Sequence, residues 1–160
     1  MTDHKKGNTV EIKTSRGTMY VSRKDVIHFP EGLFGFEEYK DYAVFDIKDC
    51  KPFKSMLSIQ EGGPDFVVVD PFLIVKDYNP LELYTSPEEL PFGSQVELTV
   101  LSIVTLAEDP KDITANFRGP LFLNISTGIA KQVILPDDQY STHELLQITE
   151  NIHETVFSCI

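Results

Sequence analysis

The sequence has little that would hold the protein in a membrane or send it out of the cell. No apolar run approaches the ~20 residues that a membrane-spanning helix requires. Residues 1–6 are polar, and no apolar stretch of the kind found in secretory signals follows them. We therefore expect a cytoplasmic protein that has no membrane partner.

Cysteines are scarce, with only Cys50 and Cys159 in a chain of 160 residues. Neither lies in a C-x-x-C pair, so a zinc or redox site has no support. A chain of this length buries roughly two-thirds of its unfolded surface, so it needs neither a disulfide nor a metal to fold as one domain. In a reducing compartment we expect two free thiols, and one disulfide is the alternative.

Basic residues are also few. The 14 Lys and Arg residues stand against 25 Asp and Glu, which gives a net charge of −11. Phosphate backbones attract cations and repel carboxylates, so this balance argues against nucleic acid as a direct partner. A basic protein would instead be attracted over a long range. The alternative is that the charge only keeps the protein soluble.

Motifs of catalysis and nucleotide binding are missing. The sequence has no G-x-S-x-G nucleophile elbow, no G-x-x-x-x-G-K-[ST] or G-x-G-x-x-G phosphate loop and no H-E-x-x-H zinc motif. Its histidines are not paired at metal-ligand spacing: His4, His28, His143 and His153. Because active sites are assembled in space, these absences only lower the odds of an enzyme. We expect no catalysis, no cofactor and no metal.

Asp70 is a carboxylate inside an apolar stretch, followed by Pro71. If it were buried, its pKa would be raised and it would serve as an acid or a base. The alternative, which we favour, is that Asp70 caps a turn by accepting backbone N–H groups. The rival function is accordingly an enzyme or a small-ligand barrel with a pocket at Asp70 and the loop 30–36. A structural subunit of a larger assembly is a further rival.

Turn-forming Pro, Gly, Asp and Asn recur every ~8–15 residues, a spacing typical of antiparallel β proteins. Apolar and polar residues alternate in several of the segments between them, as in half-buried strands. The pattern predicts a mostly β, single-domain, antiparallel fold that begins with a hairpin over 10–22. Further strands are expected within 26–29, 43–47, 53–59, 95–106, 113–117, 121–125 and 129–135, and the apolar residues 66–69 and 72–75 are expected in the core.

Helical structure is expected mainly at the C-terminus. Elsewhere the sequence predicts only short turns, at 37–39 and at 86–89, where S-P-E-E has a helix-start pattern. Ser141 and Glu144 fit a capping box, and Leu145, Ile148 and Ile152 recur at helical spacing. These residues predict a helical tail over 141–160.

Two loops carry more aromatic and charged residues than a connection needs. The first is G-L-F-G-F at 32–36, and the second is N-F-R-G-P-L at 116–121. Aromatic residues and arginine are frequent hot spots at protein interfaces. The alternative is structural: the phenylalanines would close a barrel end, and Arg118 would pair with a carboxylate.

Four segments and one tyrosine stand in a particular order and spacing. They are FPEGLFGF at 29–36, VVDP at 68–71, ANFRGPLFLN at 115–124 and QVIL at 132–135, followed by Tyr140. Together they resemble the FliW family of flagellar assembly factors over residues 9–145. The resemblance implies a compact antiparallel β barrel or pseudo-barrel without a cofactor. The expected division is a flexible N-terminus (1–8), the barrel domain (9–140) and a tail (141–160) that is longer than the family pattern requires.

The resemblance to FliW also implies two protein partners, flagellin and the RNA-binding translational regulator CsrA. Free FliW binds CsrA and stops it from repressing the translation of flagellin mRNA, while cytoplasmic flagellin competes for FliW. The acidic charge suits an RNA-binding partner, whose surface must carry basic residues. Two mechanisms stay open: repulsion of RNA by negative potential beside its site, or a shift of CsrA to a state of lower RNA affinity. A monomer is expected when the protein is free.

The residues expected at the partner surface come from the local chemistry of the two loops. They are large apolar residues, carboxylates beside them and polar residues of the second loop. By role they are the anchors Leu33, Phe34 and Phe36, the acidic rim Glu37 and Glu38, and the loop-positioning residues Asn116 and Arg118.

Overall fold

The computed structural model describes residues 6–14, 17–83, 98–136 and 139–146. The helical elements in these ranges are single turns, η1 (Lys6–Asn8), η2 (Arg23–Asp25), η3 (Pro71–Leu73), α1 (Pro80–Leu83) and η5 (Pro110–Asp112). None of the helices described is long and apolar enough to cross a membrane. The strands are β1 (Thr9–Thr14), β2 (Gly17–Ser22), β3 (Val26–His28), β4 (Asp41–Asp46), β5 (Phe53–Ser58), β6 (Asp65–Val69), β7 (Thr99–Thr105), β8 (Thr114–Ala115), β9 (Leu121–Asn124), β10 (Ile129–Gln132) and β11 (Glu144–Leu145).

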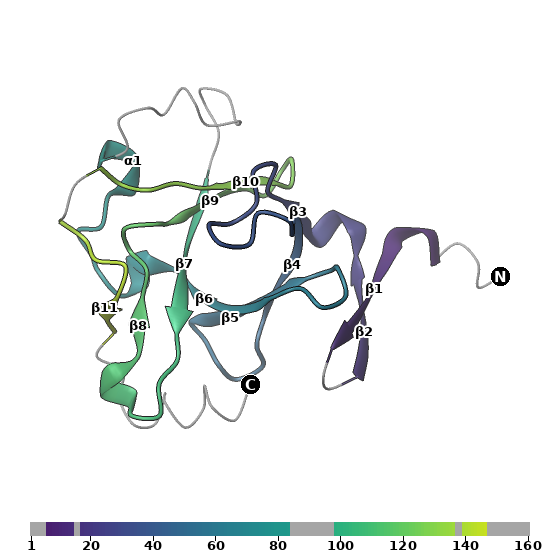
Figure 1. The fold of residues 1–160 in the computed structure, drawn as a ribbon, viewed down its shortest axis with the longest axis horizontal. Coiled ribbons are helices and arrows are strands. Elements are labelled where there is room, and N and C mark those ends of the chain that lie inside the picture. Colours follow the sequence, from purple (N-terminus) through teal and green to yellow (C-terminus); the bar gives the residue numbers. More distant parts are fainter. Residues whose placement is uncertain (1–5, 15–16, 84–97, 137–138, 147–160) are drawn as a thin grey trace.

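A closed barrel forms the body of the molecule (Figure 1), which confirms the predicted mostly β barrel. Its strands neighbour one another in the order β7-β6-β5-β4-β3-β10-β9, and the ring closes because β7 also pairs with β9. These pairings are antiparallel, apart from the parallel pairing of β3 with β10. Beyond its contact with β9, β7 pairs with β8, which in turn pairs with β11. Closure removes the free strand edges of the ring.

The interior of the barrel is filled with side chains. Phe29 and Tyr42 pack edge to face there, with ring centroids 5.6 Å apart, a favoured aromatic geometry. Such filling argues against a small-ligand barrel. The cluster takes residues from every strand of the ring and from the loop after β3: Ile27, Phe29, Leu33, Tyr42, Met56, Val68, Leu101, Leu121, Leu123 and Ala130.

A second core covers the outer face of β6, β7 and β9. Residues between η3 and α1, from β8 and from the stretch after β10 pack on this wall. The Tyr78 ring lies 5.2 Å from Phe117 and 4.9 Å from Tyr140, measured between centroids. The Tyr78 hydroxyl donates a 2.6 Å hydrogen bond to the Phe117 carbonyl oxygen. This packing fixes the start of the loop 116–120 against the barrel.

The N-terminal hairpin is a separate two-stranded sheet beside the barrel (Figure 1). Its strands pair from Thr9 with Ser22 to Thr14 with Gly17. Gly17 has a φ of 120°, which residues with a side chain rarely adopt. The hairpin predicted from the alternation over 10–22 is confirmed.

The predicted helical tail is wrong where the structure describes it, because Glu144 and Leu145 form β11 and pair with β8. The Glu144 carboxylate does accept the Ser141 N–H at 2.6 Å, and Ser141 Oγ accepts the His143 N–H at 3.0 Å. The capping residues therefore make a local turn, after which the chain finds a strand partner in space. The rest of the predicted helix and the helix start at 86–89 lie outside the described residues.

The prediction that residues 72–75 belong to the core is wrong for Phe72 and Leu73, which are 43% and 66% exposed. Both lie in η3, where Asp70 is the N-cap and Pro71 the first residue. An Asp70 oxygen accepts the Phe72 N–H at 2.9 Å, so the chain turns here instead of extending. The interpretation of Asp70 as a turn cap is confirmed.

The expectation of free thiols is wrong for Cys50, which is buried and disulfide-bonded. Pairing depends on which sulfur atoms meet in the folded chain, and the distance between cysteines along the sequence does not report that. Cys159 lies outside the described residues.

Two buried tyrosines should respond in opposite ways to the loss of the hydroxyl group. The Tyr42 hydroxyl is buried without a hydrogen-bond partner among the described residues, whereas that of Tyr78 is bonded to Phe117. Tyr42→Phe should leave the free energy of unfolding unchanged or raise it by up to ~1 kcal/mol. Tyr78→Phe should lower it by about 1–3 kcal/mol, because the Phe117 carbonyl loses its donor. Urea unfolding compares the variants, and equal losses in both would contradict this assignment.

The same tyrosines predict a loss of stability at alkaline pH. Burial raises the pKa of Tyr42 to about 12, with a smaller contribution from Tyr39, and burial also raises the pKa of Tyr78. A phenol whose pKa is higher in the folded than in the unfolded chain stabilises the fold fully below the unfolded value of about 10. The free energy of unfolding should fall as the pH rises above that value, and Tyr42→Phe should make the fall smaller.

Candidate functional site

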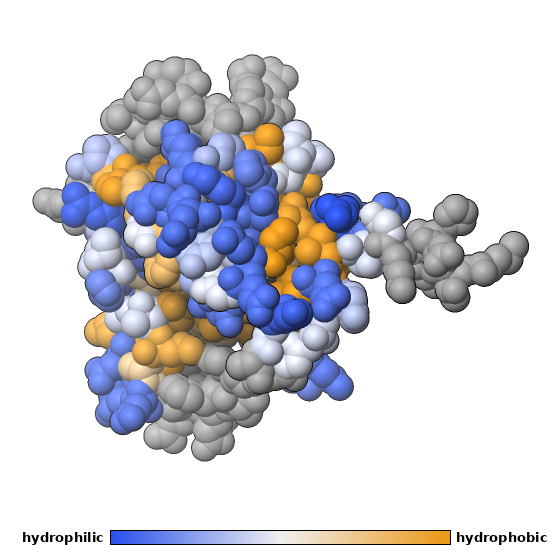
Figure 2. Space-filling model, turned by 45° about the vertical axis from the view of Figure 1, so that its right-hand side comes forward, coloured by the Kyte–Doolittle hydropathy of each residue, from blue (hydrophilic) through white to orange (hydrophobic). Residues whose placement is uncertain are grey.

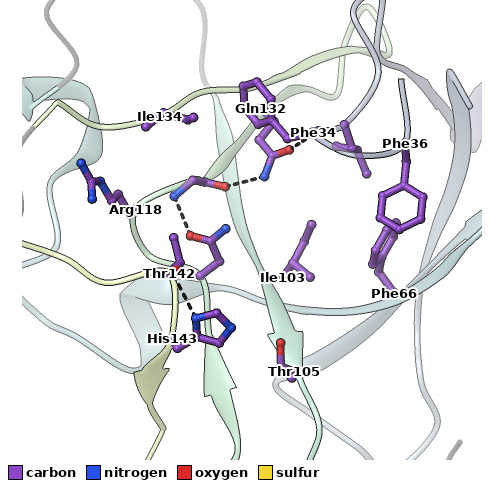
Figure 3. A pocket seen from close by; sticks show the side chains of 13 residues that line it. Phe34, Phe36, Phe66, Ile103, Thr105, Arg118, Gln132, Ile134, Thr142 and His143 are labelled. Atoms are coloured by element: carbon purple, nitrogen blue, oxygen red, sulfur yellow. Dashed lines mark hydrogen bonds between the residues drawn. The ribbon is translucent and has the colours of Figure 1, made fainter. Parts of the chain in front are cut away.

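A groove of about 570 Å³ lies at the mouth of the barrel (Figure 3). Its floor includes Leu33, Phe66 and Ile103, which also pack against the cluster inside the barrel. The two loops singled out in the sequence meet across it, since the groove is lined by five of the residues expected at a partner surface: Leu33, Phe34, Phe36, Asn116 and Arg118.

The loop after β3 points neighbouring residues in opposite directions. Leu33 is only 1% exposed and belongs to the barrel core, whereas Phe34 is 56% exposed. Phe36 is 38% exposed, and its ring packs edge to face on Phe66 with centroids 5.3 Å apart. A hydrogen bond of 2.8 Å from the Phe36 N–H to the Leu33 carbonyl oxygen closes the turn. The structural alternative therefore holds for Leu33, whereas Phe34 and Phe36 are exposed and stay candidates for a partner surface.

Gly32 and Gly35 hold this turn with φ values of 70° and 87°. A Cβ atom on Gly32 would lie 2.6 Å from the Glu37 Cα atom, whereas one on Gly35 would meet nothing within 4 Å. Gly35→Ala should cost about 1–2 kcal/mol of unfolding free energy, the strain of positive φ alone. Gly32→Ala should cost clearly more, because the backbone at Glu37 must also move. Urea unfolding of both variants tests this, and equal losses would contradict the packing.

Glu37 and Glu38 are exposed and lie outside the groove lining. The Glu37 carboxylate accepts the Gly35 N–H at 3.0 Å. The backbone N–H groups of Gly35 and of Glu37 itself, with Lys40 as a minor cause, lower the pKa of this carboxyl. The Glu37 carboxylate thus stabilises the turn through its hydrogen bond with Gly35 and also places a negative charge beside the groove.

The second loop, 116–120, is fixed on both sides. The Asn116 side-chain oxygen accepts the Gly119 N–H at 2.7 Å. The Arg118 N–H donates to the Ser141 carbonyl oxygen at 3.3 Å, and the Leu135 N–H donates to the Arg118 carbonyl oxygen at 2.8 Å. These bonds place the Arg118 side chain at the edge of the groove (Figure 3).

Sequence reasoning missed several of the residues that line the groove. Ile103 had a signal, because it interrupts the polar face of the long strand candidate at 95–106. Ile134 is 54% exposed in the segment after β10, where a strand alternation would not set it apart. The positions of Ile103 and Ile134 in the sequence did not indicate that both would line one groove together with the two loops. The full set of missed residues is Phe66, Ile103, Thr105, Gly119, Gln132, Ile134, Thr142 and His143.

The chemistry of the groove suits binding. Among the described residues that line it, Arg118 and His143 are the ionisable ones, and the rest are apolar or neutral polar. The Thr142 hydroxyl and the His143 ring lie 2.9 Å apart on an exposed turn, where they can offer hydrogen bonds to a bound molecule. Three or more metal-binding side chains do not gather anywhere in the described part of the chain.

Exposed apolar side chains are not confined to the groove. Figure 2 shows hydrophobic areas between hydrophilic ones, including one beside the part of the molecule that leads to the N-terminus. The groove gathers Phe34, Phe36 and Ile134 in one recess. Phe72 and Leu73 are also exposed but do not line the groove, which makes them suitable controls for substitutions in it.

The fold and groove together define a class: a closed, mostly antiparallel β barrel with a filled interior and an apolar recess at its mouth. The family model described as "FliW protein" matches residues 11–146 of the chain. The chain belongs to the FliW family of flagellar assembly factors.

Individual relatives agree with this assignment. The chain is 38% identical over 138 residues to the flagellar assembly factor FliW of Clostridium botulinum (strain Alaska E43 / Type E3), covering 84% of this chain and 96% of that protein. It is also 38% identical over 141 residues to FliW of Leptospira interrogans (serovar copenhageni, strain Fiocruz L1-130), covering 84% and 91%. A crystal structure of the flagellar assembly factor FliW matches with a TM-score of 0.74 and 28% identity, covering 89% of this chain and 99% of that one.

Proposed function

We propose that this flagellar assembly factor works by binding two proteins, flagellin and a CsrA-like RNA-binding regulator, and thereby relieves repression of flagellin translation. Flagellin that accumulates in the cytoplasm occupies the factor, and export of flagellin frees it to bind the regulator. On this proposal the protein acts in the cytoplasm, is a monomer when free, contacts no nucleic acid directly and performs no catalysis. Membership of the FliW family supports it.

The observation that carries the proposal is the meeting of the two loops in one groove. Phe34, Phe36 and Ile134 present apolar surface there, with Arg118 at the edge. Large aromatic residues and arginine in a recess are the composition of interface hot spots. We assign the groove as the surface that receives the apolar residues of a partner, with Glu37 and Glu38 beside it.

The carboxylates of the described protein surface lie outside the groove, so their proposed role differs from that of the apolar residues inside it. The described groove lining carries no carboxylate, while Glu31, Glu37 and Glu38 stand on the adjoining loop and Glu31 pairs with Lys131 at 3.4 Å. Long-range attraction of a basic regulator would then come from the whole surface, and apolar contacts would hold the complex. The regulator would lose RNA through negative potential beside its RNA site or through a shift to a state of lower RNA affinity.

The test is direct binding of the purified chain to flagellin and to a CsrA-like protein, each from a bacterium that carries a FliW, at two salt concentrations. We expect both to bind, flagellin to displace the regulator, and the chain to release flagellin mRNA from the regulator. Binding of the regulator should weaken with salt, because screening shortens the reach of charge from about 10 Å at 0.1 M to about 3 Å at 1 M. If neither protein binds although both are shown to be folded and active, the proposal is wrong.

A further inference from the structure

We infer that Gln132 is the positioning residue of the groove, and that its side-chain amide couples the loop carrying Phe34 to the loop carrying Arg118. The consequence for affinity rests on the proposed function, since it requires that a partner binds in the groove. The coupling itself is a property of the free chain and can be measured without a partner.

Three hydrogen bonds in series make the link, and Figure 3 shows them as dashed lines. The Phe34 N–H donates to Gln132 Oε1 at 2.9 Å. Gln132 Nε2 donates to the Gly119 carbonyl oxygen at 3.1 Å. The Gly119 N–H in turn donates to Asn116 Oδ1 at 2.7 Å. Phe34 and Gly119, which belong to two loops far apart in sequence, are joined in this way through one side chain.

The link is specific because the oxygen and the nitrogen of the Gln132 side-chain amide each have their own backbone partner. The backbone at Phe34 offers a donor and the backbone at Gly119 an acceptor, so only one orientation of the Gln132 amide satisfies both. Gln132 is 8% exposed, where an unpaired amide would be costly. A Cβ atom on Gly119 would lie 2.9 Å from Asn116 Nδ2 and 3.3 Å from Gln132 Nε2, so the second loop fits closely around the same amide.

The coupling has a consequence for binding. Phe34 is more exposed than Phe36 in the groove, yet the position of its backbone depends on a residue of the opposite loop through Gln132. A partner segment with large apolar side chains that reaches from Phe34 to Ile134 therefore meets two loops already held in register. Holding both loops in the bound arrangement reduces the entropy lost on binding, and a ligand that moves one loop shifts the other.

Exchange of the Phe34 amide hydrogen tests the coupling in the free protein. Asn116→Ala releases Gly119, and with it the anchor of Gln132, so the Phe34 amide should exchange several-fold faster. Asn124→Ala is the matched control, because Asn124 Oδ1 accepts the Thr127 N–H at the same spacing along the chain, outside the link. An unchanged Phe34 exchange rate in Asn116→Ala, or an equal increase in Asn124→Ala, overturns the inference.

Two substitutions of Gln132 itself test the consequence for a partner. Gln132→Met keeps the length of the side chain and removes both hydrogen bonds, and should weaken partner binding about tenfold. Gln132→Glu keeps an acceptor for the Phe34 N–H but, when ionised, has no donor for the Gly119 carbonyl oxygen. Protonation of the introduced carboxyl group restores a donor, so the affinity of this variant relative to the unchanged chain should rise as the pH is lowered.

The pH profile separates coupling from a simple loss of packing. Arg118 and His143, the ionisable residues of the described groove lining, are present in both chains, so the ratio of affinities removes any effect that they have on binding. Burial of the carboxyl group introduced by Gln132→Glu should raise its pKa above the ordinary glutamate value of about 4.3, so the ratio of affinities should change above that pH. A flat ratio from about pH 5 to about pH 8, with amide exchange showing the barrel intact, overturns the inference. If the unchanged chain binds neither flagellin nor the regulator, the proposed function fails, and the exchange experiment alone decides the coupling.

Discussion

Phe34→Ala is expected to weaken the binding of at least one of the two proposed partners by about 2 kcal/mol or more, roughly 30-fold in Kd. The ring is 56% exposed at the edge of the groove, so a partner that covers it gains contacts which the free protein lacks. The free energy of unfolding should change by less than about 0.5 kcal/mol, because an exposed ring contributes little to the core. Calorimetric titration with each partner and urea unfolding measure the two quantities.

Phe72→Ala is the matched control for this experiment. Phe72 is 43% exposed and does not line the groove, so its loss should leave both affinities unchanged. Two results would contradict the account. One is full affinity for both partners in Phe34→Ala. The other is a loss of about 3 kcal/mol or more in the free energy of unfolding, which would place Phe34 in the core.

Leu33→Ala should have the opposite signature, although the two residues are neighbours. Leu33 is 1% exposed and packs with the side chains inside the barrel. Removing it leaves a cavity, and the free energy of unfolding should fall by about 2–5 kcal/mol. Urea unfolding measures this loss. Any loss of partner affinity in Leu33→Ala should follow from the fraction of the chain that is unfolded.

Leu73→Ala provides the comparison for Leu33→Ala. Leu73 is 66% exposed in η3, and its truncation should change the free energy of unfolding by less than about 0.5 kcal/mol. If Leu33→Ala were as mild as Leu73→Ala while abolishing binding, Leu33 would be a surface anchor and the division of the loop between core and groove would be wrong.

Strand content was predictable from the sequence because turns and alternation are local. The hairpin β1–β2 follows from apolar positions two apart with a turn ending at Gly17, and the structure pairs these residues in register. The N-cap role of Asp70 was equally local, since it needs only the Phe72 N–H two positions on. Interactions between residues a few positions apart produce a local sequence pattern, and that pattern predicts the structure.

The tail and the groove were not fully predictable, because their partners are distant in sequence. The capping hydrogen bonds between Ser141 and Glu144 form as the sequence suggests, but pairing of Glu144 and Leu145 with β8 overrides the helix. The same holds for Gln132, whose amide joins two loops on either side of the barrel mouth. Sequence composition identified each loop separately, and only the closed barrel brings them together.

The central claim is that the groove between the two loops is the surface on which a flagellar partner binds. Hydrogen–deuterium exchange of the chain, free and in complex with flagellin or with the regulator, tests it most directly. The account predicts that in at least one complex protection appears in residues 33–36 and 116–119, with little change in the β1–β2 hairpin or in η3. Protection confined to the hairpin or to η3 in both complexes, with the two loops exchanging as in the free protein, would contradict it.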